Sequence, residues 1–148
     1  MATVDQLAVI DALLARPFQA GDSGEAHLFS GADYHLCHLQ ASRDFWEDRD
    51  EEVRDAAQQE IDTAFGHLAA ALTARWGGPE TVRIDWDDES APEPVSRLGM
   101  LTGEVQVWRR PEVDRWVGLA IGQADNEYPI ELLVTVAGLS TLPSTHRN

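Results

Sequence analysis

Four residues whose side chains can ligate zinc lie close together in the segment ADYHLCHL, namely Asp33, His35, Cys37 and His38. In an extended strand the side chains of residues 33, 35 and 37 share one face, and His38 points to the other. A structural zinc site needs four convergent ligands, so a distant histidine would have to complete it. We favour a simpler interpretation, a partly buried strand with incidental histidines, and we assign no metal and no cofactor.

Cys37 is the only cysteine of the chain, which excludes an internal disulfide and a CxxC pair. A nucleophilic cysteine needs a base that activates it, and the sequence carries no pattern that indicates such an activated pair. A lone thiol is typical of the reducing cytoplasm, where we expect this protein. The N-terminal residues lack the basic segment of a signal peptide, and no apolar run approaches the ~20 residues that span a bilayer.

The acidic segment Asp85–Glu89 follows a predicted strand and carries carboxylates that calcium or magnesium could bind. An EF-hand loop needs glycine at its sixth position and glutamate at its twelfth. Counted from Asp85, those positions hold Ser90 and Ser96. The sequence therefore favours a solvated acidic loop over a metal site.

Several chemistries are excluded by what the chain lacks. All 11 basic residues are arginines, so there is no lysine for a Schiff base or a P-loop. The GxSxG, HExxH and GxGxxG motifs are absent, and paired carboxylates cannot be chosen among 26 acids. We assign no catalytic residue. Nucleic acid and anionic membranes are not expected as partners, because the arginines are scattered among acids.

The acidic residues are concentrated in one part of the chain. Residues 44–93 hold 15 acids and four arginines, a net charge of −11, whereas the rest of the chain carries −4 of the total of −15. Such a surface accelerates encounter with a basic partner, although it also serves general solubility. The candidate partner-binding residues in this region are Trp46, Glu47, Asp48, Asp50, Asp87, Asp88 and Glu89.

In size, charge and class the chain is similar to small bacterial immunity proteins and other acidic inhibitors of basic nucleases, a resemblance that matches no residue motif. It implies a non-enzymatic protein-binding module that acts on a basic partner. Two alternatives stay open. One is a small-ligand-binding protein or enzyme with a pocket between helix and sheet, and the other is a homo-oligomeric structural protein.

Two helices are predicted to position these residues. The first covers residues 4–15, with Thr3 and Gln6 as a capping box and Val4 on its apolar face. The second covers residues 51–76, where apolar residues recur with a period of ~3.6. Asp50 is its expected N-cap, and Gly77 ends it. Phe65 and Leu68 lie in the middle of its apolar stripe, so we expect both to be deeply buried.

Strands are predicted at residues 27–29, 34–40, 82–86, 98–109, 115–122 and 129–137. Short links between sequential strands favour antiparallel hairpins. We therefore expect one α+β domain over residues 1–137, with the two helices packed on an antiparallel sheet of four or more strands. A flexible tail is expected over residues 138–148.

Trp108 and Trp116 are expected to lie close together on the sheet face that the long helix does not cover. The N-terminal helix or the segment 42–50 would cover them, or they would form a surface for a partner or for a homodimer. Both tryptophans therefore join the candidate partner-binding residues.

Overall fold

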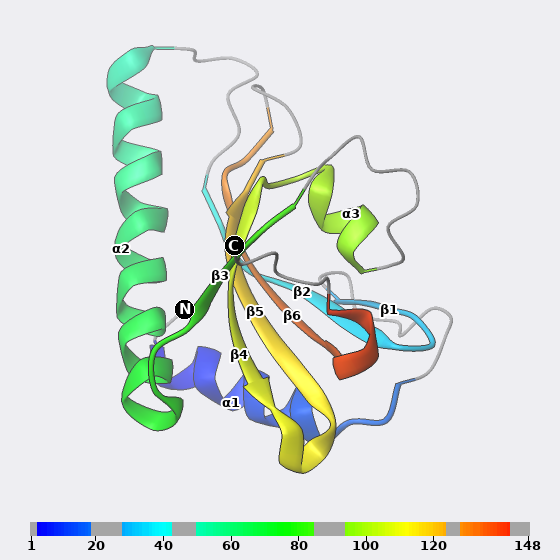
Figure 1. The fold of residues 1–148 in the computed structure, drawn as a ribbon. Coiled ribbons are helices and arrows are strands. Elements are labelled where there is room, and N and C mark those ends of the chain that lie inside the picture. Colours follow the sequence, from blue (N-terminus) through cyan, green and yellow to red (C-terminus); the bar gives the residue numbers. More distant parts are fainter. Residues whose placement is uncertain (1–2, 19–27, 43–49, 85–93, 124–127, 143–148) are drawn as a thin grey trace.

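The chain forms the α+β fold that the sequence predicts. Helix α1 (Thr3–Ala15) and the long helix α2 (Glu51–Trp76) pack on one face of a six-stranded antiparallel sheet (Figure 1). The short helix α3 (Val95–Gly99) lies on the other face. This arrangement is seen in a computed structural model that describes residues 3–18, 28–42, 50–84, 94–123 and 128–142.

Helix α2 has the predicted bounds because both of its ends are locally encoded. The Asp50 side chain accepts a hydrogen bond of 3.0 Å from the backbone N–H of Glu52, which satisfies one of the unpaired donors of the first turn. At the other end Gly77 adopts φ 91°, a left-handed conformation that favours glycine, and its N–H donates to the Thr73 carbonyl at 2.8 Å.

The sheet has the strand order β1-β2-β6-β5-β4-β3, and every pair is antiparallel. Its strands are β1 (Leu28–Ser30), β2 (Tyr34–Ala41), β3 (Glu80–Arg83), β4 (Glu104–Arg110), β5 (Arg115–Gly122) and β6 (Glu131–Gly138). Strand β2, from the N-terminal part of the chain, thus pairs with β6, the last strand, in the interior of the sheet.

Both faces of the sheet are buried. The first core lies on the face toward α1 and α2, and the second core lies on the face toward α3 and includes Val105, Trp116 and Leu133. On the face toward α1 and α2, Ile61, Leu68 and Leu72 of α2 pack on inward residues of β5 and β6, as predicted. These residues are Val117, Leu119 and Ile121 of β5 and Leu132, Val134 and Val136 of β6, joined by Ile130 just before β6. Fully burying one such side chain stabilises the fold by about 1.5–3 kcal/mol.

Helix α1 occupies the predicted residues but presents a different face. Gln6 is buried and donates to the side-chain oxygen of Gln40 in β2 at 3.2 Å, so it does not complete a capping box. Thr3 is the first helical residue, and Val4 is 71% exposed. The buried residues Gln6, Ile10 and Leu13 set the orientation of the helix. The polar Gln6 can be buried there because its side chain donates a hydrogen bond to Gln40.

The prediction of a strand over residues 98–109 is wrong in its first half. Residues 95–99 form α3, and β4 begins only at Glu104. Val95 and Leu98 are spaced three residues apart, as on one helix face, and both are buried against the second core. The Leu101 carbonyl then accepts the backbone N–H of Gln123 at 3.0 Å, which ties the turn to the end of β5.

Residues 138–142, where we expected a flexible tail to begin, continue the fold. Strand β6 extends to Gly138, and a 3-10 turn, η2 (Leu139–Thr141), follows it. Thr141 is buried, and Leu139 and Leu142 pack on the second core. The remaining part of the predicted tail, 143–148, lies outside the described residues.

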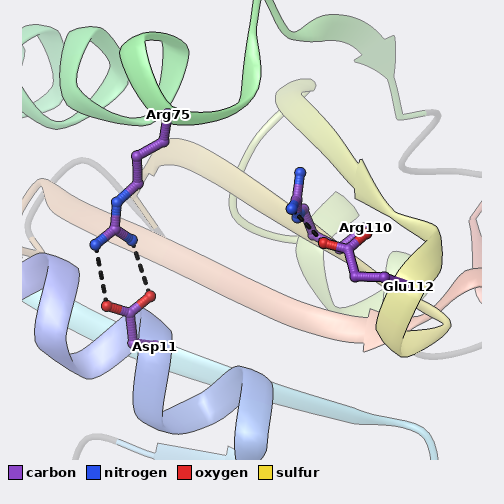
Figure 2. A network of polar contacts seen from close by, with 4 residues as sticks. All are labelled: Asp11, Arg75, Arg110 and Glu112. Atoms are coloured by element: carbon purple, nitrogen blue, oxygen red, sulfur yellow. Dashed lines mark hydrogen bonds and ion pairs between the residues drawn. The ribbon is translucent and has the colours of Figure 1, made fainter.

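The C-terminal end of α2 is fixed to its surroundings by polar contacts. Figure 2 shows Arg75 of α2 facing Asp11 of α1, with two hydrogen bonds of 2.8 and 3.2 Å. Figure 2 also shows Arg110 paired with Glu112. The guanidinium carbon of Arg110 lies 4.6 Å from the centre of the Trp76 ring. Exposed ion pairs contribute only about 0–1 kcal/mol each, so these contacts orient the helix end more than they stabilise it.

Candidate functional site

Among the candidate partner-binding residues, the structure describes Asp50, Trp108 and Trp116. Asp50 is exposed and caps α2. The other six candidates are Trp46, Glu47, Asp48, Asp87, Asp88 and Glu89, which all lie outside the described residues. Their proposed role therefore stays a prediction.

The predicted proximity of Trp108 and Trp116 is wrong, because the two side chains lie on opposite faces of the sheet. Trp108 of β4 is opposite Val117 of β5, whereas Trp116 is opposite Arg109. Trp108 belongs to the core beneath α2, and its indole N–H donates to the Gly77 carbonyl at 2.9 Å. Trp116 belongs to the second core and donates to the Thr141 hydroxyl at 3.0 Å.

Both indoles are covered within the chain, Trp108 being 3% exposed and Trp116 0%. The covering elements around Trp116 are α3 and residues 139–142, neither of which we expected to form a layer. A surface for a partner or a second copy therefore cannot include either indole in this fold.

The N-terminal half of α2 carries an exposed acidic face. Residues 50–62 contain six acids and one arginine, Arg54. All six acidic residues are exposed, and we call them the acidic face: Asp50, Glu51, Glu52, Asp55, Glu60 and Asp62. Helix α2 buries Ala57 and Ile61 against the sheet and leaves these carboxylates on its exposed sides.

A cleft of about 390 Å³ lies between α2 and the sheet. Its helix wall is Asp62 and Phe65. The remaining lining comes from the turn before β4 and from β4 and β5, namely Thr102, Glu104, Gln106, Leu119, Ala120 and Ile121. Leu119 is buried and Ile121 half-buried, whereas Asp62 and Glu104 are exposed. The cleft thus combines apolar residues with two exposed carboxylates.

Phe65 is half-buried, so the prediction that it lies deep in the core is wrong, whereas the prediction for Leu68 is confirmed at 0% exposure. Phe65 packs on the edge of the first core and also lines the cleft. The reason is geometric. The side of α2 that carries Phe65 lies above β4 and β5 at a point where the inward residues of β4 are polar.

Glu104 and Gln106 are the cleft residues that sequence analysis missed. They alternate with Trp108 along β4 and therefore face α2, where a closed core would have apolar residues. The Gln106 side-chain oxygen accepts a hydrogen bond of 3.2 Å from the Thr81 hydroxyl. Polar residues at these positions could have indicated the cleft, but sequence analysis placed Trp108, and with it this face of the strand, on the side of the sheet away from the long helix.

A second hollow, of about 220 Å³, lies on the opposite sheet face between β1, β2 and α3. Phe29 and Met100, which are 45% and 76% exposed, line it together with His38 and Arg97. The Arg97 guanidinium carbon lies 5.6 Å from the centre of the Phe29 ring, and His38 pairs with Glu131. Arg97 is thus engaged with Phe29, and His38 with Glu131.

His35 is buried and held by two polar contacts. Its Nε2 lies 3.3 Å from the Arg16 carbonyl, which can only accept, so Nε2 carries the proton and Nδ1 accepts from the Ser30 hydroxyl at 2.7 Å. Burial lowers the pKa of His35, with the nearby charges of Arg115 and Arg16 acting in the same direction. The His35 ring is neutral, makes two hydrogen bonds and is 1% exposed. It therefore stabilises the fold and is not accessible to a substrate.

The other residues of zinc-ligand type do not converge with His35. Asp33 precedes β2 and is exposed, Cys37 packs against the first core, and His38 lies on the other face, as expected. Within the described ranges, no group of three or more His, Cys, Asp or Glu side chains is placed to hold a metal ion. Nor does any helix in that part of the chain have the length and apolar character to cross a membrane.

Comparison with known proteins finds no family model that matches this sequence, no curated protein that matches it and no solved structure that matches the fold. The acidic face and the cleft are the two surface features of the described residues from which a function can be inferred.

Proposed function

We propose that this chain is a non-enzymatic protein-binding module that recognises a basic protein through the acidic face of α2. The observation that supports the proposal is the exposure of six carboxylates along one half of a single helix. A rigid helix presents these charges in a fixed pattern, which favours specific pairing and fast association more than raw affinity. The acidic residues around Asp48 and Asp88 are included in this proposal on the basis of the sequence alone.

The test compares two variants with the same change in net charge. In the first, Glu51→Gln, Asp55→Asn and Glu60→Gln neutralise part of the acidic face. In the matched control, Asp5→Asn, Asp33→Asn and Asp114→Asn neutralise three exposed carboxylates elsewhere. Asp114 adopts φ 57°, a conformation that asparagine tolerates well.

The immobilised chain should capture a basic protein from native lysate at ~50 mM salt and release it at ~500 mM, where the screening length is only a few Å. The acidic-face variant should lose the partner, and the control should retain it. Equal capture by both variants, or capture that is insensitive to salt, would contradict the proposal.

A small-ligand-binding protein is the second candidate, because the 390 Å³ cleft lies between helix and sheet. Small-molecule sites occupy about 300–1,000 Å³ and combine apolar walls with a few polar groups. Native mass spectrometry of the purified chain would support this candidate if it showed a retained small molecule that the substitution Phe65→Ala removes.

A further inference from the structure

The cleft beside the acidic face has a composition suited to one kind of side chain. Ile121 and Phe65, both half-buried, supply apolar contact, and Asp62 and Glu104 supply negative charge at exposed positions. Among the described residues that line the cleft, none is basic. The lining therefore contributes two carboxylates and no cation. One Asp62 oxygen also accepts a hydrogen bond from Gln58 at 2.8 Å, and Arg83 of β3 is opposite Glu104 in the sheet.

We infer that the cleft receives an arginine side chain of the basic partner, an inference that rests on the proposed function. The three methylenes of arginine can cover the half-buried Ile121 while the charged end stays near water. Its planar guanidinium can stack on the ring of Phe65 and donate to carboxylates in the bidentate geometry that lysine lacks. Arginine is also enriched among the residues that dominate binding at protein interfaces.

Charge complementarity favours a protein side chain over an uncharged small molecule. Asp62 belongs both to the acidic face and to the cleft wall, so a basic partner drawn to α2 meets the cleft along the same helix. The two surfaces have different roles in recognition. The acidic face accelerates the encounter, and the cleft holds one residue of the partner in a defined place.

The test uses N-acetyl-arginine methylamide as the probe, titrated into the isotopically labelled chain and followed by NMR chemical shifts. Shifts should be concentrated at residues 62–65, 102–106 and 119–121, which form the cleft. The neutral isostere N-acetyl-citrulline methylamide and the corresponding lysine compound should each bind at least about fivefold more weakly, because both lose the charged planar fork.

Two variants then separate the cleft from the acidic face. Asp62→Asn with Glu104→Gln replaces only exposed side chains and should raise the dissociation constant for the arginine probe about fivefold or more. The variant Glu51→Gln, Asp55→Asn, Glu60→Gln should leave cleft shifts in place. Equal binding of citrulline, or shifts spread along α2 outside the cleft, would overturn the inference.

The outcomes also distinguish this inference from the proposed function. Suppose that wild type and the variant Asp62→Asn, Glu104→Gln capture the partner equally and that the acidic-face variant loses it. This result would agree with the proposed function and would overturn the inference that the cleft receives an arginine. Specific binding of the arginine probe in the cleft, without any salt-sensitive partner, would support the cleft and contradict the proposed function.

Discussion

The indole of Trp116 lies across the position that a side chain at residue 118 would occupy. A Cβ placed on Gly118 would stand 2.7 Å from Cζ3 of the indole and 2.9 Å from a methyl group of Val105. Gly118 and Trp116 project from the same face of β5, and the absence of a side chain at one makes room for the largest side chain at the other.

Gly118→Ala should therefore destabilise the fold by about 1–3 kcal/mol, because overpacking forces the indole or the strand to move. The matched control is Gly66→Ala in α2, where an added Cβ would meet nothing within 4 Å and where alanine raises helix propensity. Denaturant titration measures both. A Gly118→Ala variant as stable as wild type would show that the second core is loosely packed.

Thr141→Val should remove the acceptor of the buried Trp116 indole N–H without changing the side-chain shape. Leaving this donor unsatisfied costs about 1–3 kcal/mol, and near-ultraviolet circular dichroism should report a change around the indole. Ser140→Ala, at the exposed neighbouring position, is the control. If Thr141→Val retained wild-type stability, residues 139–141 would not be fixed against the second core.

Leu68→Ala and Phe65→Ala compare a closed part of the α2 interface with the edge of the cleft. Leu68 is fully buried, so its truncation should cost about 2–5 kcal/mol. Phe65 is half-buried, and its truncation should cost less although the side chain is larger. Equilibrium unfolding in denaturant gives both values, and a larger loss for Phe65 would mean that the cleft is closed in solution.

His35 should make stability depend on pH in a defined window. Because burial lowers its pKa in the folded chain, the unfolded chain binds a proton first as the pH falls through about 6.5. Folded stability should therefore decline below that pH by at most about 1.4 kcal/mol per pH unit, until the folded pKa is reached. Above pH 7.5 this residue contributes no pH dependence.

Denaturant midpoints from pH 7.5 to 5 for wild type and His35→Gln measure this contribution as a difference in slope, which removes the background from the carboxylates. His67→Gln, a substitution of an exposed histidine on α2, controls for the loss of a histidine from the chain. Parallel slopes for wild type and His35→Gln would show that His35 is not buried as a neutral ring.

The elements that sequence analysis located correctly are those encoded locally. Helix α2 carries its cap, its stop signal and its apolar stripe within its own residues, and β5 and β6 carry regular apolar faces. Helix α3 is different, since its single turn has no side-chain cap and becomes recognisable only through the core that Val95 and Leu98 cover.

The faces of Trp108 and Trp116 depend on a turn whose geometry the sequence does not reveal. Four residues, 111–114, separate the paired residues Arg110 and Arg115. An even-numbered connection places residues of opposite parity on one face, so two even-numbered tryptophans must diverge. The cleft is equally non-local, since it depends on how α2 lies over β4 and β5.

The pairing of β2 with β6 determines when this chain can complete its sheet during synthesis. Tyr34 is opposite Ala137, so the two partners are about a hundred residues apart. Until β6 leaves the ribosome, β2 has only the three-residue β1 beside it, and an isolated hairpin is marginal in water. Leu36 and Leu39, both buried in the finished fold, therefore stay exposed on the nascent chain while most of it is made. Such long-range pairing slows folding, and it leaves these residues open to chaperones or to aggregation for that time.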